Sequence, residues 1–234
     1  FLNFDVIKVY EKWITDFVDN QNEEGEISGI VPSSGWGYGG KYGPAWNAAL
    51  FIIPDVIHTY YGDINGINNI YNSCKKYLDF LKQKENPDGL LTQGYGDWVT
   101  PNTKTPVDYV VSCYYYLDYL LMEKFSKTLG YDSSPYSLKV SVLKEQINKK
   151  YFNADSCIYS NGSQTAMAMA LYLQLPAKSY EQKVAEKLAE NVKNNNYFLD
   201  FGIHGSRYVL EMLSKYGYAE YAYKMATKET PPSW

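Results

Sequence analysis

The chain has 234 residues, of which 45% are hydrophobic and 21% charged, and its formal net charge is −4. These values are typical of a folded globular protein and argue against a disordered chain. They also argue against nucleic acid as a partner, which favours an excess of Lys and Arg, and against a membrane span, which needs about 20 consecutive apolar residues.

The hydrophobic pattern is helical along the whole chain. Apolar residues at 6, 9, 10, 13, 14 and 17 share one face of a first helix. Further helices are predicted at residues 44–61, 67–81, 106–129, 135–150, 163–173, 178–193, 202–217 and 218–227. No segment alternates polar and apolar residues as a strand would. We therefore expect an all-α chain of about nine helices, forming a single domain over residues 1–234.

The connections between the predicted helices alternate between long and short. Two of the long ones are glycine-rich loops, at residues 35–43 and 90–104. An up-and-down bundle does not need this alternation, whereas a toroid of helical hairpins places its functional loops on one rim. The pattern therefore favours a toroid.

Cysteine and histidine are scarce. Cys74, Cys113 and Cys157 are widely spaced, which predicts free, mostly buried thiols and neither a disulfide framework nor a metal site. Only His58 and His204 are present, so a multi-histidine metal site is not expected. His58 lies within a predicted helix and is interpreted as structural.

The two glycine-rich loops carry most of the candidate ligand contacts. Trp36 and Trp46 lie in or just after the first loop, and Tyr95 and Trp98 lie in the second. Glycine lets backbone approach a ligand closely, and aromatic rings pack against the C–H faces of sugars. The alternative is that these rings only fill the ends of helical hairpins. Likewise, the 25 tyrosines are interpreted mainly as helix-face packing.

Two polar residues accompany these aromatic side chains. Asp97 precedes Trp98 and is predicted either to accept hydrogen bonds from sugar hydroxyls or to brace its loop. His204 lies between glycines where a turn enters a helix, so it is a candidate ligand contact as well as a candidate structural residue.

Several motifs together resemble the catalytic domain of bacterial α-L-rhamnosidases. They occur in the order of that family and cover nearly the whole chain: Asn3-Phe4-Asp5-Val6, Lys12-Trp13, Gln21 to Pro32, Trp46 to Pro54, Tyr61-Gly62-Asp63, Tyr95-Gly96-Asp97-Trp98, Gln164, Phe201 to Ser206, Leu213 to Tyr218, and Pro232-Ser233-Trp234.

The resemblance implies an (α/α)6 toroid that hydrolyses terminal α-L-rhamnose with inversion and uses no organic cofactor. Trp46 and Trp98 match aromatic residues of the family's rhamnose pocket, and Asp97 matches its neighbouring acid. The family's general acid and general base are expected in motifs before and after this chain, so we assign no catalytic residue here and expect the chain alone to be inactive. A second departure is Ala48, where the family usually has Asp.

Two alternatives remain open at this stage. One is a non-catalytic sugar-binding or scaffold toroid, and the other is a related toroid hydrolase acting on a different sugar. The expected partner is a rhamnose-containing saccharide or glycoside, with neither nucleic acid nor a membrane as a partner. The residues do not indicate a compartment.

About nine helices fall short of a complete toroid, and the chain has no initiator Met. We therefore expect a piece of a longer protein whose unclosed edge exposes apolar helix faces. The isolated chain should self-associate in light scattering, and a dispersed monomer would contradict this expectation.

Overall fold

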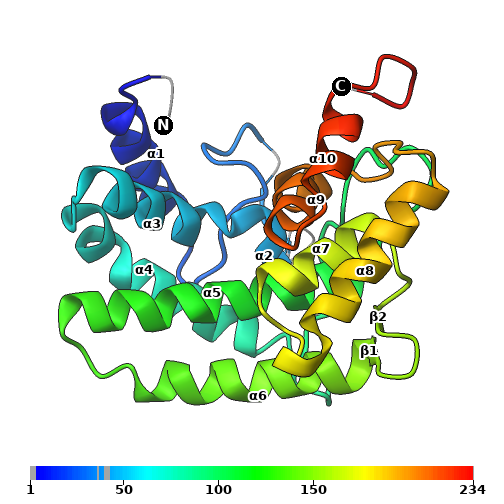
Figure 1. Cartoon of the computed structure of the whole chain (residues 1–234). Helices are drawn as coiled ribbons and strands as arrows, with labels where there is room; N and C mark the ends of the chain where they lie inside the picture. The colour runs from blue at the N-terminus through cyan, green and yellow to red at the C-terminus, as the bar shows by residue number, and fades with distance from the viewer. Residues whose placement is uncertain (1–3, 36, 40–42, 234) are drawn as a thin grey trace. The chain divides into compact units, whose positions relative to one another are not determined.

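The computed structural model describes residues 4–35, 37–39 and 43–233, and this part of the chain folds into ten helices and one short hairpin (Figure 1). The elements are α1 (Ile7–Asn20), α2 (Gly43–Asn47), α3 (Ala49–Tyr61), α4 (Asn65–Lys82), α5 (Val107–Leu129), α6 (Ser134–Tyr151), β1 (Phe152–Asn153), β2 (Ile158–Tyr159), α7 (Gln164–Tyr172), α8 (Lys178–Asn194), α9 (Ile203–Lys215) and α10 (Ala219–Ala226).

The chain divides into two compact units that are interleaved in sequence. The first unit comprises residues up to Tyr95 together with Tyr114–Leu143. The second unit comprises Gly96–Cys113 and the residues from Lys144 onward. Helices α5 and α6 contribute residues to both units. The single domain expected from the sequence stays a prediction.

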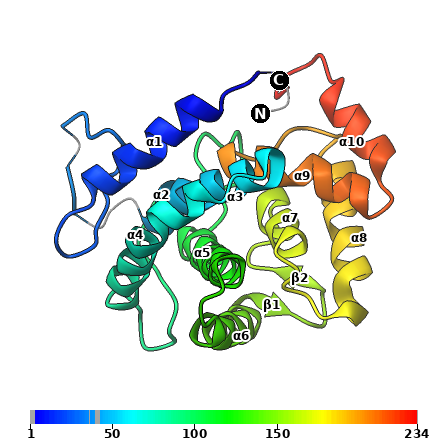
Figure 2. The ribbon, with the colours of Figure 1, turned by 90° about the vertical axis from the view of Figure 1, so that its left-hand side faces the viewer.

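In the first unit, α1 packs against α3 and α4 (Figure 2). Ile14 and Phe17 are buried on the inner face of α1, because they lie on the apolar stripe of that helix. The indole Nε1–H of Trp13 donates to the carbonyl oxygen of Val31 at 2.8 Å. Helix α3 ends at Gly62, whose φ of 70° and N–H bond to the carbonyl of His58 form a left-handed cap.

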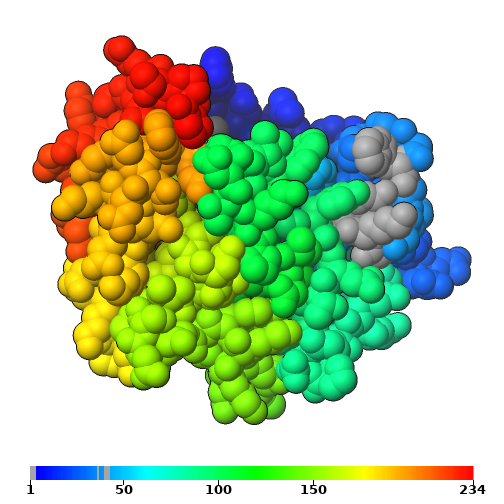
Figure 3. All heavy atoms as spheres, turned by 90° about the vertical axis from the view of Figure 1, so that its right-hand side faces the viewer, coloured from blue at the N-terminus to red at the C-terminus, as the bar shows by residue number. Residues whose placement is uncertain are grey.

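In the second unit, α7 is the central helix, with every residue from Gln164 to Leu171 buried. Helices α8 and α9 pack against it, and α10 packs against both α8 and α9. The hydroxyl of Ser163 accepts the N–H of Ala166 at 3.2 Å and caps α7. Helix α8, in yellow to orange, lies at the surface on the face that Figure 3 shows.

The predicted helices are confirmed, with two differences of detail. The helix expected over 44–61 is interrupted at Ala48, so it forms α2 and α3. The link after α6 contains antiparallel strands β1 and β2 of two residues each, too short to produce an alternating pattern. None of the helices in the described ranges combines the length and apolar character that a membrane span needs. The three cysteines are free and buried, as expected.

The carboxyl group of Asp118 is buried in the first unit without a hydrogen-bond partner. Asp118 on α5 is fully buried, and neither side-chain oxygen has a hydrogen-bond partner. Burial raises the pKa of Asp118 well above its ordinary value, because the charged form loses its hydration. Burial therefore favours the protonated, neutral form of this carboxyl group.

Replacing Asp118 should change how stability depends on pH. As pH rises above about 4, the unfolded chain loses the proton of Asp118 while the folded chain keeps it. The free energy of unfolding should then fall by up to about 1.4 kcal/mol per pH unit until the folded-state pKa is reached. Asp118→Asn should remove this slope in urea unfolding measured between pH 4.5 and 7.5.

The matched control is Asp79→Asn, which alters an exposed aspartate of α4 in the same unit. This control should keep the pH dependence of the unaltered chain. Identical pH profiles for the two variants would show that Asp118 is not the titrating group.

Candidate functional site

The carboxylate of Asp97 organises the entry to α9 in the second unit. Its Oδ1 accepts the backbone N–H of His204 at 2.8 Å and of Gly205 at 3.4 Å. Its Oδ2 accepts the N–H of Gly202 at 2.8 Å and the hydroxyl of Thr165 at 2.5 Å. Asp97 is buried, so these donors replace the water that the charge has lost. The geometry favours the bracing role among the two alternatives for Asp97.

A second aspartate, Asp200, joins the same two segments. It lies just before α9 and accepts hydrogen bonds from the loop that contains Asp97. Asp200 Oδ1 accepts the backbone N–H groups of Asn102 and Thr103 at 3.0 and 2.9 Å. Its Oδ2 accepts the hydroxyl of Thr103 at 2.5 Å. Asp97 therefore anchors the segment that begins α9, and Asp200 anchors the loop that contains Asp97.

These hydrogen bonds fix the backbone beside Trp98, while the residue itself stays largely exposed. The carbonyl of Trp98 accepts the N–H of Ile203 at 3.0 Å, while 60% of the residue's surface is exposed. Val99 follows with a φ of 62°, a strained value for a β-branched residue. Gly202 is needed opposite them, because a Cβ there would lie 2.1 Å from the carbonyl oxygen of Trp98. The indole ring of Trp98 is therefore attached to a backbone segment that these hydrogen bonds hold in place.

His204 donates one of these hydrogen bonds to Asp97. Its side chain is buried, and burial lowers the pKa of the imidazole below its ordinary value. The negative charge of Asp97 and a backbone hydrogen bond with Gly96 act in the opposite direction, and Arg207 adds to the lowering. The imidazole is therefore neutral at neutral pH.

In the first unit, Trp46 and Tyr95 form a second aromatic group. Trp46 lies on α2, and its ring centroid is 5.0 Å from that of Tyr95, with a tilt of 54° between the planes. Both residues are partly exposed. Ala48 follows at the N-cap position of α3 and offers no side-chain acceptor there.

The structure thus groups Asp97, Trp98 and His204 in one unit, and Trp46 with Tyr95 in the other. Trp36 lies outside the described residues. Within the described residues, no cluster of three or more His, Cys, Asp or Glu is arranged to hold a metal ion. Asp200, Thr165 and Thr103 were not predicted from the sequence. Asp200 could have been suspected, because it lies two residues before Gly202, the N-cap of α9.

Removing the charge of Asp97 should destabilise the second unit. Asp97→Asn places an amide NH2 against backbone N–H donors, so the free energy of unfolding should fall by about 2–3 kcal/mol in urea denaturation. Asp155→Asn, at an exposed aspartate of the same unit, should change it by less than about 0.5 kcal/mol. Equal effects of the two substitutions would contradict the bracing role.

Comparison with known proteins places this chain among rhamnosidases. It is 26% identical over 225 residues to an α-L-rhamnosidase of Streptomyces avermitilis, covering 95% of this chain and 21% of that protein. It is 30% identical over 204 residues to an α-L-rhamnosidase of Formosa agariphila, covering 80% of this chain and 21% of that protein. The chain therefore spans about a fifth of the length of these relatives.

Solved structures agree with these sequence matches. The α-L-rhamnosidase of Dictyoglumus thermophilum superimposes with a TM-score of 0.91 at 34% identity, covering 98% of this chain and 27% of that chain. The Streptomyces avermitilis enzyme complexed with L-rhamnose gives a TM-score of 0.92 at 23% identity, covering 98% of this chain and 22% of that chain.

The family model described as the bacterial alpha-L-rhamnosidase 6 hairpin glycosidase domain matches residues 1–234. Its helical hairpins agree with the all-α, (α/α)6 fold class that the sequence predicted. The chain belongs to the family of bacterial α-L-rhamnosidase six-hairpin glycosidase domains.

Proposed function

We propose that this chain forms part of the rhamnose-binding pocket of an inverting α-L-rhamnosidase. The observation that carries the proposal is the exposed ring of Trp98 on a backbone that Asp97 and Asp200 hold in place. Such a ring is preorganised to pack against the C–H face of a sugar, because little conformational entropy is lost on binding. Trp46, which pairs with Tyr95 within the first unit, is proposed separately as an aromatic sugar contact of that unit.

Asp97 and His204 act in this proposal mainly by positioning Trp98. Asp97 uses both carboxylate oxygens on donors of the protein, which leaves it poorly placed for proton transfer. His204 contributes the backbone N–H that Asp97 Oδ1 accepts, and its imidazole is buried. Their effect on substrate is therefore indirect.

The chemical step needs two further carboxyl groups. Inverting hydrolysis uses a general acid at the leaving oxygen and a general base that activates water, about 6.5–9.5 Å apart. We assign neither role to a residue of this chain, and infer that the general acid and general base belong to other parts of the catalytic domain. The chain alone should bind rhamnose without hydrolysing rhamnosides.

Truncating Trp98 should weaken sugar binding. Trp98→Ala removes the ring but leaves the carbonyl that binds the N–H of Ile203, so the fold should persist. Calorimetry with L-rhamnose should show an affinity at least about tenfold lower, the loss expected for a dominant aromatic contact.

Tyr223→Ala is the matched control, because Tyr223 is an aromatic residue of the same unit and is 69% exposed. It should leave the affinity unchanged. Equal affinities of the unaltered chain, Trp98→Ala and Tyr223→Ala for rhamnose would exclude Trp98 from the pocket. Hydrolysis of a nitrophenyl rhamnoside by the chain alone would contradict the inference that the general acid and general base lie elsewhere.

A further inference from the structure

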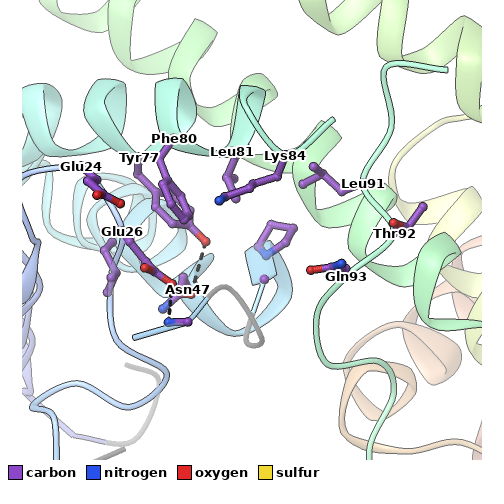
Figure 4. Close-up of a pocket in the computed structure, with 14 residues that line it drawn as sticks. Glu24, Glu26, Asn47, Tyr77, Phe80, Leu81, Lys84, Leu91, Thr92 and Gln93 are labelled. Atoms are coloured by element: carbon purple, nitrogen blue, oxygen red, sulfur yellow. Dashed lines mark hydrogen bonds between the residues drawn. The ribbon is translucent and has the colours of Figure 1, made fainter. Parts of the chain in front are cut away.

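The first unit contains a cavity and a separate groove. The cavity has a volume of about 360 Å³, and Figure 4 shows Tyr77, Phe80 and Asn47 around it, with Lys84 at its edge. Asn47 directly follows Trp46 on α2, so the cavity adjoins the aromatic pair already proposed as a sugar contact. We assign it no separate ligand.

The groove lies on the opposite face of α4. It has a volume of about 450 Å³ and is formed by α4, α5 and the start of α6 (Figure 2), and all of its lining residues belong to the first unit. Lys75 and Lys82 line the groove and lie about half a turn round α4 from Tyr77 and Lys84, which line the cavity. A groove of this size suits a small ligand.

The groove offers aromatic faces together with hydroxyl groups. Tyr119 is buried, and its ring centroid lies 6.4 Å from that of Tyr136, with a tilt of 45° between the planes. The hydroxyls of Tyr71 and Ser126 are hydrogen-bonded at 2.9 Å. Burial and a hydrogen bond with Tyr71 raise the pKa of Tyr136, so its hydroxyl keeps its proton. A sugar matches both features, because it has a C–H face and several hydroxyls.

Two of the charged residues that line the groove are already used within the protein. Lys139 forms an ion pair with Glu85. Asp132 Oδ1 accepts the backbone N–H of Ser134 at 2.9 Å, at the start of α6. These pairs leave little charge at that wall for a ligand.

The other charged residues of the groove form a row along α4. Lys75, Asp79 and Lys82 follow one another at intervals of four and three residues, so they share one face of the helix, and all three are exposed. Among the described residues, none of these three side chains has an ion-pair partner. The row therefore has a net positive charge, with a lysine at each end and an acceptor between them.

This row favours a ligand with one negative charge and several hydroxyls. A single carboxylate can bond to a lysine while hydroxyls of the same ligand donate to Asp79. A second negative charge would meet Asp79 at short range. A phosphate dianion would also lack its preferred bidentate partner, because the single arginine of the chain, Arg207, lies in the second unit.

We propose that the groove is a second saccharide-binding site and that it takes a hexuronate residue. The carboxylate bonds to Lys75 or Lys82, hydroxyls bond to Asp79 and Tyr136, and the C–H face of the sugar packs on the ring of Tyr136. The proposal is independent of the proposed function, because none of the proposed rhamnose contacts lines the groove. Such a site would hold the protein on acidic glycan chains.

The test compares methyl β-D-glucuronide with methyl β-D-glucoside, which differ only in a carboxylate or a hydroxymethyl group at C5 of the ring. Calorimetry at about 50 mM salt should show at least about tenfold tighter binding of the glucuronide by the unaltered chain. In amide chemical-shift mapping, the glucuronide should shift Lys75 and Tyr136, and acetate at the same concentration should not. Raising the salt to about 0.5 M should reduce the preference, because salt screens exposed charges.

A double variant, Lys75→Met with Lys82→Met, should remove the preference for the glucuronide and leave the affinity for the glucoside unchanged. Methionine keeps most of the aliphatic stem of lysine. Asp79→Asn should instead tighten the binding of the glucuronide, because it removes a like charge. The matched control is Lys8→Met with Lys76→Met, two exposed lysines of the same unit that do not line the groove. This control should bind both glycosides as the unaltered chain does.

The outcomes separate this site from the proposed rhamnose pocket. Equal affinity of the unaltered chain for the two glycosides, equal losses in the two double variants, or the same shifts with acetate would overturn the hexuronate site. Displacement of the glucuronide by methyl α-L-rhamnoside would contradict a separate site. Binding of the glucuronide without any binding of the rhamnoside would support the groove and contradict the rhamnose pocket alone.

Discussion

The buried carboxylate of Asp97 is the group on which the candidate site of the second unit depends. A helix begins with backbone N–H groups that have no partner within the helix and carry a partial positive charge. A buried carboxylate has the opposite deficit, because it has lost water that donated hydrogen bonds. At the start of α9 these deficits cancel, since Gly202, His204 and Gly205 donate to Asp97. The position of Trp98 is a consequence, because it is covalently joined to the residue that makes these bonds.

Asp118 shows how far the surroundings decide the role of an aspartate. It is buried as Asp97 is, but it lies within α5, where the backbone N–H groups are already used by the helix. Neither of its side-chain oxygens has a donor, and burial raises the pKa of Asp118, which favours the protonated carboxyl group. One buried aspartate therefore accepts several hydrogen bonds and holds a loop in place, whereas burial favours the neutral form of the other at a cost that depends on pH.

The difference between these two residues marks the limit of what the sequence could predict. Helices α4 and α7 could be predicted from the apolar pattern, which is a local signal. The bond between Asp97 and Thr165 joins residues 68 positions apart, and those between Asp200 and the 102–103 segment span 97 or 98. No periodicity encodes such pairs, so the sequence left open whether Asp97 faces a ligand or the protein.

The abundance of tyrosine has a physical explanation in the same terms. Tyrosine can fill a helical core only where its hydroxyl finds a partner. Tyr109 donates to the carbonyl of Ala166 at 2.9 Å, and Tyr115 donates to Glu85 at 2.7 Å. Most of the 25 tyrosines need no ligand to account for them.

Tyr77 extends this argument to the cavity in the first unit. Its ring is part of the core, yet its hydroxyl bonds to Asn47 at the cavity wall. Core packing therefore also fixes the orientation of the Asn47 amide, without a separate element to support it. A phenylalanine at this position would fill the core equally well but would leave the amide of Asn47 without one of its two side-chain bonds. The choice of tyrosine over phenylalanine at residue 77 is thus explained by the hydrogen bond that its hydroxyl makes to a buried amide.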